Sequence, residues 1–208
     1  MILETVCVGQ MEVNCYLLAP GEGAPTIIID PGAELGKIKR VLEKHKLTPA
    51  FIINTHGHYD HIGCDDKFGV PVYIHRSDSA LLKDPGLNLS SVFAMPYEVK
   101  SKIEALEDNQ IIELQGLQLK VLHIPGHTPG GIALHMLKPD DKIVFTGDTL
   151  FSGGIGRSDL EGGDEGLLIK SIKEQLLTLA NETIVYPGHG PSSTIGREKK
   201  HNPYLALR

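Results

Sequence analysis

The chain has 208 residues, with 20 lysines and arginines against 26 aspartates and glutamates, so its formal net charge at neutral pH is −6. Hydrophobic residues make up 41% and charged residues 22%, values that exclude a disordered or fibrous protein. The acidic balance argues against a nucleic-acid partner, and no apolar run is long enough to span a bilayer. The three cysteines are widely spaced and the first residues do not resemble a secretion signal, so we expect a cytoplasmic protein without disulfides.

The chain alternates short β-rich runs with helical patterns, which is typical of an α/β protein. In chain order the patterns predict a strand at 2–8, strands at 13–19 and 26–29, a helix at 34–46, strands at 50–53, 71–74, 110–114, 117–124, 131–136 and 142–146, a helix at 165–179 and a strand at 183–186. Residues 84–101 are predicted to form a loop over one face. Residues 152–166 contain six glycines and are predicted to form a flexible loop, and the tail from Gly190 is predicted to be irregular.

Four of the expected strands end in the same way, with a histidine or an aspartate directly after the last apolar residue. The strand at 50–53 runs into the segment Thr-His-Gly-His-Tyr-Asp-His at 55–61, and three later strands run into His127, Asp148 and His189. A glycine beside each of these residues allows a sharp turn. Because strand ends in α/β proteins meet at one edge of a sheet, we expect these side chains to converge there.

Imidazole and carboxylate are the ligands that suit zinc, iron and manganese. The seven candidate ligands are too many for one tetrahedral ion, so the sequence predicts two divalent ions, zinc in the first place, with iron or manganese as alternatives. The division that we expect gives one ion His56, His58 and His127 and the other ion Asp60, His61 and His189, with Asp148 bridging the two.

Two divalent ions, two carboxylates and one hydroxide carry a net charge of about +1, so the site is expected to attract anionic substrates and to activate water. The expected reaction is attack of the bridging hydroxide on a substrate carbonyl, with Asp60 as the catalytic residue that orients the hydroxide and takes its proton. Arg157 is expected to bind a substrate carboxylate by a forked pair of hydrogen bonds. Tyr59 is expected to line the substrate pocket, and Asp30 to support a metal-bound imidazole.

Segment 55–61, together with the later His127, Asp148 and His189, resembles the metallo-β-lactamase superfamily over essentially the whole chain. Segments 147–151, 154–159, 189–191 and 201–204 resemble those of the short glyoxalase II-like (hydroxyacylglutathione hydrolase-like) hydrolases. The resemblance implies an αββα sandwich of two mixed β-sheets flanked by helices, with a dinuclear metal site at the sheet edge. It also implies hydrolysis of thioesters such as S-D-lactoylglutathione. We expect one domain over 1–208, with no separate C-terminal helical glutathione-binding domain of the kind that full-length glyoxalase II carries.

Other activities of the same superfamily remain as alternatives. One is a mononuclear-iron persulfide dioxygenase, and another is a lactonase or other ester hydrolase. The expected partner is a small, anionic thioester, with no nucleic-acid or membrane partner, and the expected assembly is a monomer or a small homo-oligomer. Metal content separates the first alternative from the hydrolase, because a dioxygenase uses one iron and consumes oxygen.

Overall fold

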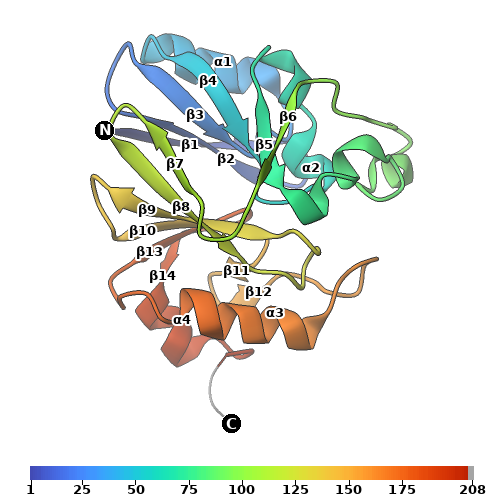
Figure 1. Cartoon of the computed structure of the whole chain (residues 1–208), viewed down its shortest axis with the longest axis vertical. Coiled ribbons are helices and arrows are strands. Elements are labelled where there is room, and N and C mark those ends of the chain that lie inside the picture. Colours follow the sequence, from blue (N-terminus) through green and yellow to red (C-terminus); the bar gives the residue numbers. More distant parts are fainter. Residues whose placement is uncertain (206–208) are drawn as a thin grey trace.

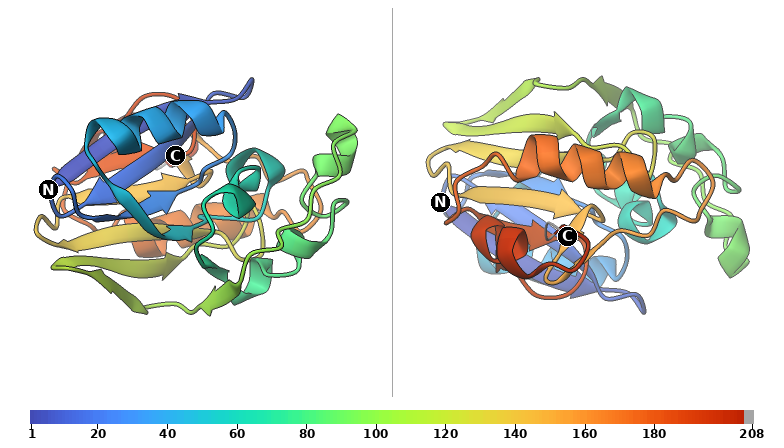
Figure 2. Two further views of the ribbon diagram at one scale, coloured as in Figure 1. Left: turned by 90° about the horizontal axis from the view of Figure 1, so that it is seen from above. Right: turned by 90° about the horizontal axis from the view of Figure 1, so that it is seen from below.

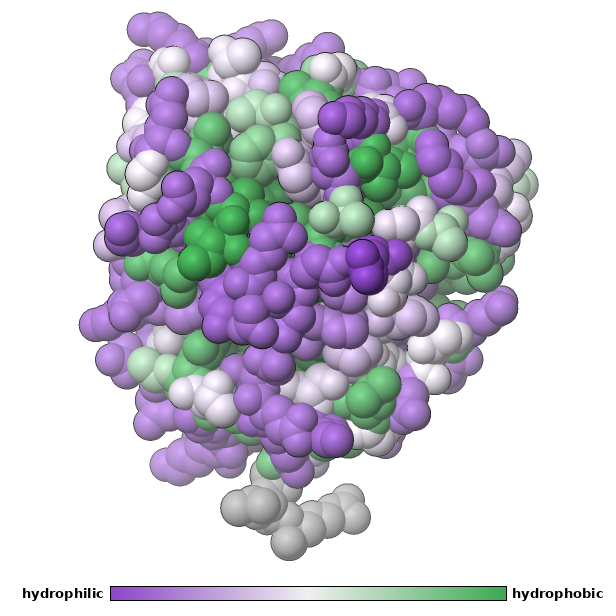
Figure 3. All heavy atoms as spheres, in the orientation of Figure 1, coloured by the Kyte–Doolittle hydropathy of each residue, from purple (hydrophilic) through white to green (hydrophobic). Residues whose placement is uncertain are grey.

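The structure, a computed structural model, describes residues 1–205 and consists of two six-stranded sheets stacked face to face, with helices on both outer faces (Figures 1 and 2). Both sheets contain parallel and antiparallel pairs. The predicted αββα sandwich of mixed sheets is therefore confirmed. The face seen in Figure 3 is covered mainly by hydrophilic side chains, with hydrophobic atoms in small patches between them.

The strands of the first sheet lie side by side in their order along the chain. They are β1 (Ile2–Val8), β2 (Val13–Ala19), β3 (Pro25–Ile29), β4 (Thr48–Ile53), β5 (Val72–His75) and β6 (Ile103–Leu106). The pairs among β1, β2 and β3 are antiparallel, whereas the pairs from β3 to β6 are parallel. The C-terminal ends of β3, β4 and β5 therefore lie at one edge, and Asp30, His56 and Asp78 follow them.

The second sheet has the order β14-β13-β10-β9-β8-β7. Its strands are β7 (Ile111–Leu114), β8 (Leu117–His123), β9 (Ile132–Lys138), β10 (Ile143–Gly147), β13 (Ile184–Pro187) and β14 (Ser193–Thr194). Because β10 and β13 pair parallel, Asp148 and His189 follow neighbouring strand ends. The loop between β8 and β9 carries His127 to the same edge.

Backbone hydrogen bonds connect the two sheets at this edge. The Asn14 amide donates to the Gly188 carbonyl at 2.7 Å, and the Ile132 amide donates to the Thr55 carbonyl at 2.9 Å. These contacts fix the strand ends of one sheet against those of the other.

Helices and a small hairpin complete the fold. They are α1 (Leu35–Lys44), α2 (Tyr59–Ile62), the hairpin of β11 (Leu150–Phe151) and β12 (Gly154–Ile155), α3 (Glu165–Ser171) with a π-helical continuation (Ile172–Leu176), α4 (Ile195–His201) and the short 3₁₀ helices Asp65–Lys67, Arg76–Asp78, Leu81–Lys83 and Ser90–Phe93. Figure 2 shows α1 over the first sheet in one view and α3 and α4 over the second sheet in the other. No helix in residues 1–205 combines the length and the apolar character needed to cross a membrane.

Three hydrophobic layers hold these elements together. In β3, Ile28 packs on the outer side with Ile38 and Leu42 of α1, whereas Ile27 and Ile29 pack between the sheets. The third layer lies between the second sheet and the helices α3 and α4. Because both faces of the central strands are buried, their sequences read as continuous apolar runs.

The sequence patterns missed β6, α4 and the two-residue strands β11, β12 and β14, and the flexible loop predicted at 152–166 contains β12. The strand β6 lies in a stretch that was not assigned, because four residues with one charge among them are too short to show a period. The prediction of an irregular tail from Gly190 is wrong, because α4 lies there. The buried residues of α4 are Ile195 and Glu198, so the helix packs partly through a charged side chain and lacks the apolar pattern of an amphipathic helix.

Candidate metal centre

The segment after β4 is fixed by one buried carboxylate. Asp30 accepts hydrogen bonds from the Thr55 amide and the Thr55 hydroxyl, both at 2.7 Å, and its Oδ2 lies 2.9 Å from Nδ1 of His61. Asp30 and His61 are fully buried, at 1% and 0% exposure. The ring of His61 is thereby oriented with Nε2 free to face the centre, as the sequence led us to expect of Asp30.

A second buried carboxylate, Asp78, connects two ligand-bearing loops. Its Oδ2 accepts hydrogen bonds from the Gly57 amide at 3.1 Å and the Thr128 hydroxyl at 2.7 Å, and its Oδ1 accepts one from the Gly130 amide at 2.6 Å. Gly57 lies between His56 and His58, and Thr128 follows His127. Asp78 therefore sets the distance between the loop after β4 and the loop after β8.

Three of the predicted ligands form a first triad, His56, His58 and His127. Their ligand atoms lie within 4.8 Å of one another, and all three residues are buried. Nδ1 of His58 is 3.0 Å from Nε2 of His127. Nδ1 of His127 donates to the carbonyl of Arg157 at 2.7 Å, which leaves Nε2 of His127 directed at the other two rings.

A second triad is formed by Asp60, His61 and His189, whose ligand atoms also lie within 4.8 Å of one another. Nδ1 of His189 donates to the carbonyl of Met11 at 2.8 Å, and its Nε2 lies 3.4 Å from Oδ2 of Asp60. The two triads are the same two sets into which the sequence was divided.

Asp148 lies between the triads. Its Oδ1 is 3.3 Å from Nε2 of His61, and its Oδ2 is 3.4 Å from Nε2 of His189 and 3.9 Å from Nε2 of His127. Gly188 makes this position accessible, because a Cβ there would lie 2.2 Å from Oδ1 of Asp148. The carboxylate thus faces both triads, as a bridging ligand must.

The donor atoms of this cluster fit two cations. His56 Nε2, His61 Nε2 and Asp148 Oδ1 are buried and have no hydrogen-bond partner within residues 1–205, since the short contact between the last two lacks the geometry of a hydrogen bond. Buried polar atoms without partners are costly, and metal coordination would satisfy them. The other ring nitrogens of His61, His127 and His189 are already bound to protein oxygens. No cysteine belongs to the cluster, which is typical of a catalytic rather than a structural zinc site.

The two triads differ in their protonation without metal. Burial, helped by the neighbouring imidazoles, lowers the pKa of His56 well below its ordinary value and that of His58 to about 4. Burial also opposes protonation of His61, but the nearby carboxylates, Asp148 foremost, outweigh it and raise the pKa of His61 well above its ordinary value. Contacts with Asp148 and Asp60 raise the pKa of His189 to about 10 against the effect of burial.

The carboxylates of the second triad show the reverse shifts. Burial alone would raise the pKa of Asp148, but the charge of His61 and the contact with His189 hold it well below its usual range. The same two imidazoles lower the pKa of Asp60 in spite of its burial. In the protein without metal, protons on two imidazoles therefore balance the charge of these two carboxylates.

The two residues expected to bind substrate differ in their surroundings. The Arg157 side chain is exposed, and its Nε and Nη2 both donate to Asp159 at 2.8 Å, so its forked donors already have a carboxylate partner. Tyr59 lines a cavity beside Asp60. The role of Asp78 was not anticipated, although it is one more acidic residue shortly after a parallel strand and so carries the same sequence signal as the other strand ends.

The chain is similar to known proteins along almost its whole length. The family model described as the metallo-beta-lactamase superfamily matches residues 8–189. The hydroxyacylglutathione hydrolase GloC of Haemophilus influenzae is 35% identical over 99% of this chain and 98% of its own. The solved structure titled BLEG-1 B3 metallo-beta-lactamase is 37% identical, with a TM-score of 0.91 over 99% of this chain and all of the other. The structure titled TTHA1623 in a di-iron-bound form is 36% identical, with a TM-score of 0.82 over 97% of this chain and all of the other.

Proposed function

Since the chain belongs to the metallo-β-lactamase superfamily, we propose that it is a dinuclear-metal-dependent hydrolase of thioesters. The observation that carries the proposal is the pair of three-ligand sets with Asp148 between them, since Asp148 also forms a group with one member of each set, His56 and His61. The similarity to a protein named hydroxyacylglutathione hydrolase supports a thioester as the substrate. S-D-lactoylglutathione is accordingly the first substrate to test.

In this proposal His56, His58 and His127 hold one ion, and Asp60, His61 and His189 hold the other. Two divalent ions held there would supply Lewis acidity and activation of water at neutral pH. Zinc, iron and manganese all suit the donor set, and the di-iron form of a relative makes iron a serious alternative to zinc.

Residues of the chain orient the metal-ligating imidazoles and accept the proton of the attacking water. Asp30, the Met11 carbonyl and the Arg157 carbonyl fix the rings of His61, His189 and His127 so that each directs Nε2 inward. Asp60 is the proposed acceptor of the proton from the attacking water, because its carboxylate belongs to the donor cluster. The leaving thiol has an ordinary pKa of about 8.5, so the reaction needs no strong general acid.

Arg157 remains the proposed contact for a carboxylate on the thiol portion of the substrate. Because both of its forked donors are bound to Asp159, the substrate carboxylate would have to replace Asp159. The Arg157 carbonyl binds His127, so the side chain starts close to the first triad.

The decisive experiment combines metal analysis with a substrate panel. We expect about two metal ions per chain and release of thiol from S-D-lactoylglutathione, coenzyme A thioesters or small thioesters without oxygen uptake. One iron per chain together with oxygen uptake on a glutathione persulfide would favour the dioxygenase instead. Release of product from lactones with no thioester cleavage would favour the lactonase.

Hydrolysis of β-lactams is a second candidate, because the chain superposes on a protein titled a B3 metallo-beta-lactamase over nearly its full length. The same donor cluster would serve an amide carbonyl. A chromogenic cephalosporin, assayed beside the thioester panel with the same enzyme preparation, separates the two: the proposal requires a higher kcat/KM for the thioester.

A further inference from the structure

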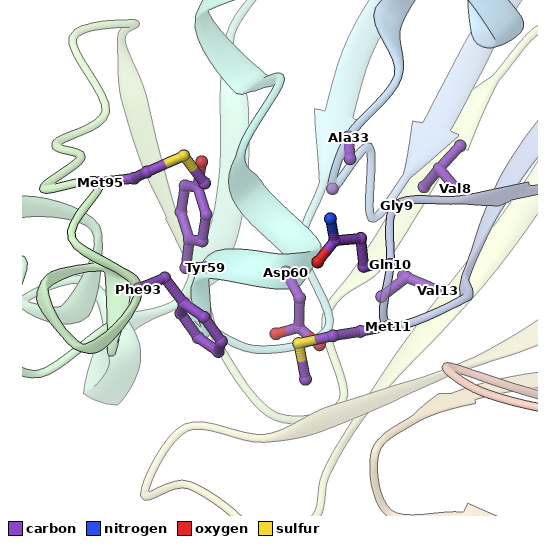
Figure 4. Close-up of a pocket in the computed structure, with 11 residues that line it drawn as sticks. Val8, Gly9, Gln10, Met11, Val13, Ala33, Tyr59, Asp60, Phe93 and Met95 are labelled. Atoms are coloured by element: carbon purple, nitrogen blue, oxygen red, sulfur yellow. The ribbon is translucent and has the colours of Figure 1, made fainter.

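A cavity of about 270 Å³ lies next to the second triad, and Asp60 is the ligand of that triad that lines it. It is bounded by the turn between β1 and β2 on one side and by residues 90–97 on the other, and Figure 4 shows Asp60 directed into it. Met11, whose carbonyl binds His189, is part of its wall. A group bound in this cavity would therefore be adjacent to the metal ligands.

The walls of the cavity are mainly apolar. The apolar side chains that line it are those of Val8, Met11, Val13, Ala33, Phe93 and Met95. Tyr59 adds an aromatic ring, 6.5 Å from the ring of Phe93. In the part of the chain that the structure describes, no lysine, arginine or histidine lines the cavity, and its one charged residue is Asp60.

Three of these large apolar side chains are about half exposed to solvent. Met11 and Phe93 are each 49% exposed, and Met95 is 54% exposed. They belong to two segments about eighty positions apart in the chain, and Figure 4 shows them around the same space. Exposed apolar side chains that face one another mark a ligand-binding surface, and methionine adapts to ligands of different shape.

The ends of the longer segment are fixed while its middle is open. The Asn88 side-chain amide donates to the carbonyls of Leu81 and Tyr97, and the Tyr97 amide donates to the Ser90 hydroxyl. Phe93 and Met95 lie between these fixed points. The segment therefore holds its apolar side chains out over the cavity rather than burying them in the core.

We propose that this cavity binds an apolar acyl group of the substrate, so that the enzyme prefers thioesters with an acyl chain of four to six carbons over acetyl and lactoyl thioesters. The inference rests on the proposed thioesterase function and specifies its substrate class. Among the described residues, a glutathione moiety with its carboxylates finds no cation in this cavity. The polar side chains of its lining, Gln10, Tyr59 and Asp60, are outnumbered by the six apolar ones that would contact an acyl chain. A cavity of about 150 Å³ holds a benzene molecule, so this one has room for a longer chain.

The first test measures kcat/KM of the metal-loaded enzyme for N-acetylcysteamine thioesters, whose thiol is uncharged and constant. Each methylene of the acyl chain that becomes buried is expected to raise kcat/KM by about fourfold. The value is therefore expected to rise from acetyl to butanoyl and again from butanoyl to hexanoyl, each step adding two methylenes. The lactoyl thioester is expected to fall below the butanoyl one. A flat or falling series, or a preference for lactoyl, would overturn the inference.

Variants locate the effect in the cavity. Phe93→Ala and Met95→Ala are each expected to lower the ratio of hexanoyl to acetyl kcat/KM by about tenfold, and Phe93→Leu to restore most of it. Val92→Ala is the matched control, because Val92 is 76% exposed on the same 3₁₀ helix and does not line the cavity. An equal change of the ratio in the control would contradict the assignment.

A binding measurement tests whether the cavity binds an acyl group, independently of thioester cleavage. The chain has four methionines, of which Met11 and Met95 line the cavity, Met136 is buried in the core and Met1 is the N-terminus. Titration of zinc-loaded, [¹³C]methyl-methionine-labelled protein with hexanamide is expected to shift the Met11 and Met95 signals saturably and to leave the other two in place. Unchanged Met11 and Met95 signals would refute the cavity as an acyl site, whereas absent thioester cleavage with these shifts present would refute only the proposed function.

Discussion

The two triads of the metal centre use the same imidazole side chain under opposite electrostatic conditions. In the first triad, burial among other imidazoles keeps His56 and His58 neutral at pH 7. In the second triad, the carboxylates of Asp60 and Asp148 keep His61 and His189 protonated when no metal is present. The neighbours of a buried histidine therefore decide whether its ring is protonated, and so whether a metal ion must displace a proton before it binds.

Removal of the carboxylate that faces both triads is expected to have the largest effect. Asp148→Ala would take away one proposed ligand from each ion. Loss of a residue that only hydrogen-bonds to a metal ligand typically costs up to about 100-fold in activity, so we expect the loss for Asp148→Ala to be larger than that. Metal content, measured on the purified variant, is expected to drop below two ions per chain. Retention of two ions and of activity would contradict the bridging role.

The difference in protonation predicts a difference in the pH dependence of metal binding. His61 and His189 have raised pKa values, so at pH 7 each must lose a proton before it can bind a metal ion. Loading of the second triad is therefore expected to release about two protons, and its apparent affinity to fall about a hundredfold for each unit by which the pH is lowered through neutrality. In the first triad the pKa values of His56 and His58 are lowered, so these two ligands are expected to add little pH dependence.

Calorimetric titration of the metal-free protein with zinc in buffers of different ionisation enthalpy measures these protons. Two binding phases, of which only the weaker one changes with pH between about pH 6 and 8, would support the comparison. Equal proton release from both phases would contradict it.

Asp30 contacts the second triad directly, through His61, and reaches His56 of the first triad only through Thr55. Its substitution is expected to have the next largest effect. Asp30→Asn removes the negative charge beside His61 Nδ1, 2.9 Å away, and leaves an amide there. Loss of such an outer contact typically costs about 10- to 100-fold in metal affinity. We expect this loss mainly in the weaker binding phase, measured by competition with a chelator, with a smaller change in the tighter phase.

Asp78 supports the first triad, so Asp78→Asn is the counterpart of that variant. The substituted amide no longer accepts from all of the Gly57 amide, the Thr128 hydroxyl and the Gly130 amide, which loosens the loops of His58 and His127. We expect a loss of about tenfold, at the lower end of the range for outer contacts, and in the tighter phase only. If Asp30→Asn and Asp78→Asn weaken the same phase most strongly, the two triads are not separate sites.

Local sequence patterns predicted the layers of the fold because the central strands are buried on both faces and read as apolar runs. The β6 strand and α4 were missed, since one is four residues long and the other packs partly through the buried Glu198. The convergence of His127, Asp148 and His189 on segment 55–61 could be predicted, because side chains that directly follow strand ends in an α/β protein meet at one edge of the sheet. The two structural triads have the membership that their spacing and chemistry had suggested.

The sequence by itself determined which side chains form the donor cluster, because ligand chemistry belongs to the residue type and the strand ends that carry it are recognisable locally. Only the tertiary structure decided which nitrogen of each ring faces inward, since that depends on carbonyls and carboxylates from distant loops, such as those of Met11, Arg157 and Asp30. The structure alone also placed Met11 beside Phe93 and Met95 in one cavity. Exposed apolar residues on two separate loops follow no period, and only the packing of the sheets brings them together.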